Sequence, residues 1–214
     1  GTPGPTQCTI ISVNTFRDYY DRTPPSGLAR SRTTMTSMID IHPTDTAPAG
    51  TTPRAGLHPT RNGVSAETRA TLIPLLNQLL ADTVDLRSQT KQAHWNVRGV
   101  HFQPLHELFD GVADVLPDFS DELAERVGML GGVAAGTVRN AATSSRLAEI
   151  EGGLLSGQDA VVAVAERLAF VTNAVREGIS ISGEQGDEVT ADLLTEIARE
   201  LDKQLWFVES HLER

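Results

Sequence analysis

The sequence predicts an all-α fold, a four-helix bundle preceded by a largely irregular N-terminal extension. Within residues 66–214, four stretches repeat an apolar residue at every third or fourth position, the spacing that gives a helix one buried stripe. Aromatic residues make up only 5% of the chain, and Leu, Val and Ala dominate its apolar content, which favours packed helices over sheets. A chain of 214 residues is long enough for one substantial domain.

The extension covers residues 1–65 and differs in composition from the rest of the chain. It holds eight of the eleven prolines, is rich in Thr and lacks sustained apolar periodicity. Such a segment is expected to be irregular coil or linker. The bundle domain is expected over residues 66–214, because Ser65 is suited to cap the first helix.

The first two helices are expected at about 66–97 and 101–130. Their apolar stripes are regular, and Gly131-Gly132 gives the second helix a clear end. Pro74 and Pro117 fall inside these helices, and an internal proline removes a hydrogen bond and usually kinks a helix. They are the main features that speak against the helical prediction.

The last two helices are expected at about 157–182 and 187–213. Between the second and third helices lies a long connection, residues 133–156, in which we expect a short helix around Ser145–Glu151. Four helices of this length with one longer crossover are typical of a ferritin-like bundle.

Charge is distributed unevenly along the chain, whose net charge is −10. Residues 1–65 carry a net charge of +2, whereas residues 66–214 carry twelve Lys and Arg against twenty-four Asp and Glu. An acidic domain attracts cations and repels nucleic acid, so DNA contact is expected only through the extension. No apolar run approaches the roughly 20 residues of a membrane helix.

The single cysteine, Cys8, excludes an internal disulfide framework, and nothing indicates an oxidising compartment. We expect the protein in the cytoplasm, associated with the nucleoid if DNA is bound. Export stays open, because the chain begins at Gly1 and a signal peptide could already have been removed.

Polar residues with the chemistry of metal ligands follow one face of the second helix. At about 100° per residue, His106, Asp110, Asp121 and Glu125 span about 100° of the helix wheel. The centre of this face lies roughly 155° from the centre of the apolar stripe. These side chains are therefore expected to point away from the core of their own subunit.

Distance along the helix divides these four residues into two pairs. At about 1.5 Å per residue, Asp110 and Asp121 lie about 16 Å apart, too far to share one ion. An antiparallel copy of the helix, related by a two-fold axis, would set the His106/Asp110 pair against the Asp121/Glu125 pair. The sequence thus suggests two equivalent sites per dimer.

The first helix supplies a further imidazole, His94, near its end. Imidazole and carboxylate ligands together suit a ferrous or similar divalent ion. A weak, partly open site of this kind lets Fe(II) bind, meet an oxidant and leave as Fe(III).

The motifs around these residues resemble those of the Dps family (DNA protection during starvation), the miniferritins. Residues 91–132 carry Lys-Gln-Ala-His94-Trp95-Asn-Val-Arg-Gly, Leu-His106-Glu, Asp110-Gly and Asp121-Glu-Leu-Ala-Glu125-Arg. The likeness continues at Thr190-Ala-Asp192 and at residues 201–207 and covers nearly all of 66–214.

The resemblance implies an iron-storage ferroxidase. By it, His94, His106 and Asp110 of one subunit and Asp121 and Glu125 of its two-fold mate bind iron, and Trp95 traps oxidising equivalents. It also implies a hollow dodecamer that oxidises Fe(II) preferentially with hydrogen peroxide and stores an Fe(III) mineral, and many members bind DNA through Lys-rich tails. This chain differs from those DNA-binding members, because residues 66–214 contain only two lysines and the extension contains few Arg residues.

Acidic residues open the fourth predicted helix at Asp187, Glu188 and Asp192. One interpretation is that they complement the helix dipole in its first turn. The other, implied by the family, is a pore that admits ions at a three-fold axis.

Two other functional classes fit the sequence less well. A di-iron enzyme with the metal inside one bundle needs Glu-x-x-His pairs, and no His here has Glu three residues before it. A structural DNA-compacting nucleoid protein with incidental metal binding is disfavoured by the acidic domain. His101 is interpreted as an interface residue or one that supports the ligands, and His42, His58 and His211 as ordinary polar residues.

Overall fold

The structure is a computed structural model that describes residues 57–212. Four long helices form the bundle: α1 (Ala66–Asn96), α2 (Phe102–Met129), α4 (Gly157–Glu184) and α5 (Glu188–Glu209). Their order and lengths confirm the predicted ferritin-like fold. The expectation of an irregular extension falls almost entirely on residues 1–56, which lie outside the described residues.

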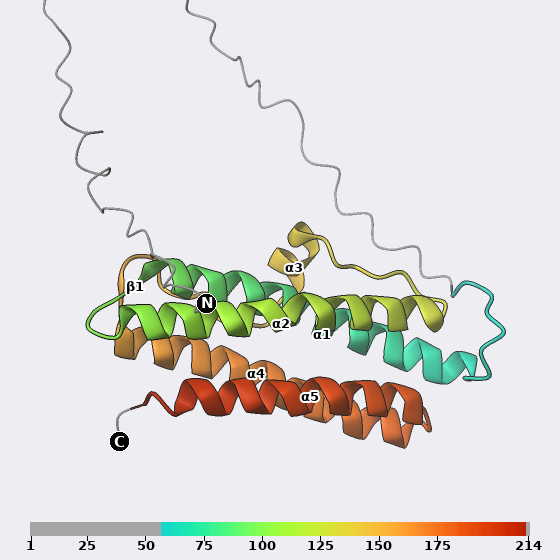
Figure 1. The fold of residues 1–214 in the computed structure, drawn as a ribbon. Helices are drawn as coiled ribbons and strands as arrows, with labels where there is room; N and C mark the ends of the chain where they lie inside the picture. Colours follow the sequence, from blue (N-terminus) through green and yellow to red (C-terminus); the bar gives the residue numbers. More distant parts are fainter. Residues whose placement is uncertain (1–56, 213–214) are drawn as a thin grey trace, which may run out of the picture. The chain divides into compact units, whose positions relative to one another are not determined.

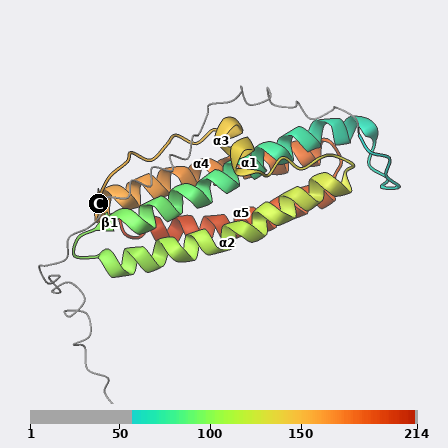
Figure 2. The same ribbon diagram turned by 90° about the horizontal axis from the view of Figure 1, so that it is seen from above.

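The bundle consists of two antiparallel hairpins, α1–α2 and α4–α5, which pack against each other (Figures 1 and 2). At one end of the bundle the α1–α2 connection, the start of α4 and the end of α5 come together. The opposite end holds the start of α1, the end of α2 and the α4–α5 turn. Among the helices of residues 57–212, none is long and apolar enough to cross a bilayer.

Helix boundaries follow from side-chain caps. The hydroxyl of Ser65 accepts a hydrogen bond from the Thr68 amide and begins α1, as predicted. Ser156 caps α4 in the same way, and Asp187 caps α5. Pro74 and Pro117 lie inside α1 and α2, which nevertheless run as continuous helices.

The core contains most of the leucines and valines of the predicted stripes, while Leu108, Leu205 and Leu212 are only partly buried and pack against it. Each of the four long helices contributes side chains that are 0–1% exposed, for example Leu79, Leu116, Leu168 and Leu194. Phe109 of α2 is also fully buried. The apolar stripe fills the interior and leaves the predicted ligand face of α2 outside it.

The crossover between α2 and α4 contains the predicted short helix, but at a different place. Helix α3 spans Val138–Ser144, capped by Thr137, and the expected helix at 145–151 is wrong. Side chains of α1 hold that segment extended: Asp82 accepts hydrogen bonds from the Arg146 amide and guanidinium, and Gln89 accepts one from the Ile150 amide. A helix there would lose these contacts.

A short parallel bridge closes the crossover at one end of the bundle. Strand β1 (Val97–Arg98) pairs with β2 (Leu155–Ser156). It ties the end of α1 to the start of α4. The bridge therefore fixes the place where α2 begins, close to the predicted ligands His94 and His106.

Candidate metal centre

The two predicted histidine ligands of one chain lie against each other at the end of the α1–α2 hairpin. The imidazole rings of His94 and His106 are stacked, with 3.6 Å between their centroids and 21° between their planes. His94 is buried and His106 half-buried. The ring of Phe102 lies near that of His106, with 5.1 Å between their centroids.

Reciprocal hydrogen bonds fix the orientation of both rings. Nδ1 of His94 lies 2.7 Å from the main-chain oxygen of His106, and Nδ1 of His106 lies 2.9 Å from the main-chain oxygen of His94. A carbonyl oxygen only accepts, so each Nδ1 carries the proton and donates it. Each Nε2 is left with a free lone pair, the form in which a histidine binds a metal ion.

Asp110 adds a carboxylate beside the histidine pair, one turn along α2. Its Oδ1 lies 3.9 Å from Nε2 of His94 and forms an ion pair with Lys91 of α1. The hydrogen bond from Lys91 is the main reason that the pKa of Asp110 lies below its ordinary value; burial opposes this effect, and the charge of Lys91 adds to it. Asp110 is therefore a charged carboxylate at neutral pH.

Trp95 follows His94 directly and is 58% exposed, with the Lys91 ammonium 5.9 Å from the centroid of its ring. The indole is therefore open to solvent beside the ion pair of Lys91 with Asp110. Lys91 is thus shared between Asp110 and this ring.

Asp121 and Glu125 lie on the same helix as His106 but far along it. Both are exposed, and Asp121 lines a surface groove of about 450 Å³ with residues of α1 that include Arg87. Within residues 57–212 of a single chain, no three His, Cys, Asp or Glu side chains come close enough to hold a metal ion. One chain therefore places His94 against His106 and near Asp110 without completing a metal site, and it leaves Asp121 and Glu125 exposed.

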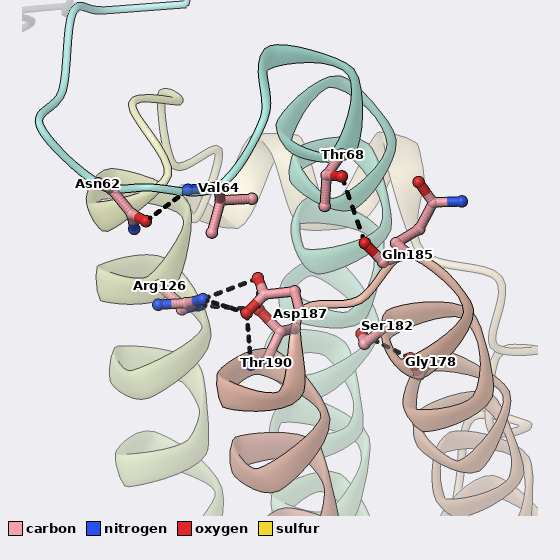
Figure 3. Close-up of polar contacts among 9 residues, drawn as sticks. All are labelled: Asn62, Val64, Thr68, Arg126, Gly178, Ser182, Gln185, Asp187 and Thr190. Atoms are coloured by element: carbon pink, nitrogen blue, oxygen red, sulfur yellow. Dashed lines mark hydrogen bonds and ion pairs between the residues drawn. The ribbon is translucent and has the colours of Figure 1, made fainter.

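Asp187, predicted to help form an ion pore, is 3% exposed and ion-paired with Arg126 of α2 (Figure 3). The guanidinium of Arg126 lies 2.8 Å from both carboxylate oxygens, and the hydroxyl of Thr190 donates to one of them. Burial would raise the pKa of Asp187, but the hydrogen bonds from Thr190 and Arg126 outweigh it and hold this pKa below its ordinary value. Glu188 and Asp192, in contrast, are exposed.

Sequence reasoning did not single out Arg126 or Glu122. Glu122 is half-buried, and one of its carboxylate oxygens has no hydrogen-bond partner among the described residues. Burial, followed by the charges of Glu196 and the neighbouring acids of α2, raises its pKa. Both residues lie next to the apolar stripe of the second helix, and this position was the sequence signal that they would be partly or fully buried.

Comparison with known proteins agrees with this architecture. A family model described as a ferritin-like domain matches residues 73–214. The DNA protection during starvation protein of Agrobacterium fabrum is 39% identical over 156 residues, which cover 73% of this chain and 96% of that protein. The chain belongs to the Dps family.

Solved Dps structures have the same fold. DpsA14 from Streptomyces coelicolor matches with a TM-score of 0.70 and 33% identity, covering 75% of this chain and 96% of that one. The Dps protein of Vibrio cholerae matches with a TM-score of 0.68 and 25% identity, covering 74% and 99%. The latter is described as a member of a broad superfamily of ferritin-like diiron-carboxylate proteins.

Proposed function

We propose that the protein oxidises Fe(II) at sites shared between two subunits and stores the product as an Fe(III) mineral. The stacked pair of His94 and His106 carries this proposal. Its two Nε2 lone pairs are fixed by main-chain hydrogen bonds, and the carboxylate of Asp110 lies beside them. Two imidazoles and a carboxylate suit ferrous iron, and the diiron-carboxylate relatives support this choice of metal.

The second half of each site is assigned to Asp121 and Glu125 of a two-fold-related copy. These carboxylates are exposed, and Asp121 lies about 16 Å along α2 from Asp110. When two α2 helices pack antiparallel, the outward acids of one subunit meet the histidine pair of the other. Two carboxylates from the partner raise the ligand set from three to five and neutralise the charge of the bound iron.

Two residues of the chain have further roles in this reaction. Lys91 neutralises Asp110 before iron binds and has to leave this carboxylate as the cation arrives. Two Fe(II) ions then give up one electron each, and one hydrogen peroxide takes up both electrons and two protons as its O–O bond breaks into two waters. Trp95, exposed next to the site, takes up oxidising equivalents that escape this reaction.

The assembly proposed for this chain is the hollow dodecamer. The outward ligand face requires a dimer, and the similarity to Dps structures supports closure into a shell. Light scattering of the full chain at neutral pH should give a particle of about twelve times 23.0 kDa. A stable monomer that oxidises Fe(II) rapidly would contradict both the shell and the shared site.

Protection of DNA is assigned mainly to the iron chemistry, with DNA binding as an accessory of the extension in a cytoplasmic, nucleoid-associated protein. Residues 66–214 are strongly acidic and repel phosphate, while residues 1–65 carry a net charge of +2. Deletion of residues 1–65 should abolish gel retardation of DNA and leave Fe(II) oxidation intact. Retardation by the truncated protein would instead favour the DNA-compacting alternative.

Single substitutions test the site directly in anaerobic Fe(II) titrations followed by peroxide. Removing a residue that only hydrogen-bonds a metal ligand lowers metal affinity or activity about 10–100-fold. His106→Ala and Glu125→Ala remove proposed ligands themselves, so each should slow rapid oxidation at least that much. His58→Ala and Glu177→Ala, which change exposed residues elsewhere, serve as matched controls. If the two ligand variants oxidise iron as fast as the controls, the proposed site is wrong.

A further inference from the structure

Two further histidines, His101 and His211, line one surface pocket at the end of the bundle where α2 begins. This pocket of about 450 Å³ is lined by residues from three distant parts of the chain, among them His101, Ser156 and His211. The β1–β2 bridge brings the start of α2 beside the start of α4, and α5 ends at the same place (Figures 1 and 2). His94 and His106 do not line this pocket.

His101 occupies a position where another residue type would stabilise the helix. It is the N-cap of α2 and forms no capping hydrogen bond, whereas Ser65, Thr137, Ser156 and Asp187 each cap their own helices in the described part of the chain. A capping side chain contributes about 0.5–2 kcal/mol to helix stability, and His101 does not supply this contribution. Its imidazole is left available to the pocket.

His211 is prepared for metal binding in the same way as the histidine pair described above. Its Nδ1 lies 2.9 Å from the main-chain oxygen of Phe207, one turn back in α5. Because the carbonyl only accepts, Nδ1 is protonated and Nε2 has a free lone pair. The hydrogen bond also orients the ring, as outer partners of metal-binding histidines do.

The other groups of the pocket determine which ion it would take. No Asp or Glu is among its lining residues, and the hydroxyl of Ser156 is already engaged with Asp159 at the start of α4, so oxygen is offered by the amide of Gln158 and by main-chain groups. The guanidinium of Arg98 is occupied by the carbonyl oxygens of Trp95 and Val97. Imidazole without carboxylate selects late transition metals such as Zn²⁺ over Mg²⁺ and Ca²⁺, and binds Fe²⁺ more weakly.

We propose that His101 and His211 together bind one Zn²⁺-type ion per subunit, outside the iron site. The bound ion links the end of α5 to the start of α2, two segments that lie far apart in the sequence. It should therefore raise the Tm of the assembly, since an ion that binds only the folded state stabilises it.

Zinc binding to the assembled full-length protein tests the proposal. Equilibrium dialysis against Zn²⁺ in excess Mg²⁺ should show one strong site per subunit fewer in His101→Ala, in His211→Ala and in the double variant than in the wild type. His58→Ala is the matched control, because it removes an exposed histidine outside the pocket. The zinc-dependent rise in Tm should be smaller in the three pocket variants than in the wild type and this control.

Three outcomes would overturn the proposal. They are a wild-type number of strong sites in either single variant, loss of two sites in the double variant, or displacement of the ion by Mg²⁺. Because the measurement counts zinc and not iron oxidation, these results are separate from those that decide the ferroxidase proposal.

Discussion

At the residue scale, main-chain carbonyls determine what the functional side chains can do. His94 and His106 each donate from Nδ1 to the other's carbonyl oxygen, so the fold itself selects the tautomer that binds metal. The sequence contained both histidines at sites suited to ligands. The reciprocal hydrogen bonds of the two histidines and the ion pair of Lys91 with Asp110 could not be predicted from the sequence, because both depend on how α1 and α2 are aligned.

The Arg126–Asp187 ion pair is predicted to make stability depend on pH. Asp187→Asn keeps a capping oxygen but leaves Arg126 without its counter-charge, and breaking a buried pair costs about 3–5 kcal/mol. The pKa of Asp187 is lowered in the folded state. The contribution of its ionised carboxylate to the free energy of unfolding is therefore complete above the ordinary pKa of 3.8 and is lost as the pH falls towards the folded-state pKa.

Urea unfolding between neutral and acidic pH measures this effect. The difference in free energy of unfolding between wild type and Asp187→Asn should be large at neutral pH and shrink below about pH 4. Asp114→Asn, at an exposed position of α2, is the matched control. A difference that stays constant down to pH 2 would show that this ion pair does not contribute as argued.

At the element scale, the long helices were predictable because propensity, periodicity and capping agree. The expected ends of α1, α2 and α4 lie within two residues of those observed, whereas α5 ends at Glu209 and not near residue 213. The short helix was predicted at the wrong place because hydrogen bonds to α1 hold the segment extended. Asp82, Asp85 and Gln89 on α1 accept hydrogen bonds from residues 145–150. A local pattern cannot show acceptors about 60 residues away in the chain.

The turn after α2 gives a prediction with a built-in control. Gly131 has φ +79°, and a Cβ there would lie 2.5 Å from the carbonyl oxygen of His58, which packs on this turn. Gly131→Ala should therefore lower the free energy of unfolding by more than about 1 kcal/mol. Gly128→Ala, inside α2 with open space around it, should raise it by about 0.5–1 kcal/mol. Denaturation showing equal effects for both would contradict this account of the turn.

At the scale of the whole molecule, the fold and the family follow from the sequence. The assembly depends on contacts between several copies of the chain, which the structure of one chain does not contain. The wheel of the second helix placed His106 and Asp110 on one face with Asp121 and Glu125, and all four lie outside the core, exposed or half-buried. What the sequence could not give was the role of Asp187, because its partner Arg126 lies 61 residues away and across the bundle.

The exposed acids at the start of α5 remain the proposed route for iron into the shell. Glu188→Gln combined with Asp192→Asn removes negative potential that concentrates cations at a pore. Fe(II) oxidation should slow at low iron and recover at saturating iron, because the oxidation site is untouched. Stopped-flow rates that do not change across this range would leave these acids with only their role in the first helical turn.

Subunit mixing tests the shared site most directly. His106→Ala and Glu125→Ala assemblies should each oxidise Fe(II) slowly. After subunit exchange, confirmed by mass, a mixed dimer has one site with both lesions and one with neither. We predict that rapid oxidation returns, approaching half of the wild-type sites when every dimer is mixed and fewer under random pairing. No recovery at any mixing ratio would contradict the claim that each site draws on two subunits.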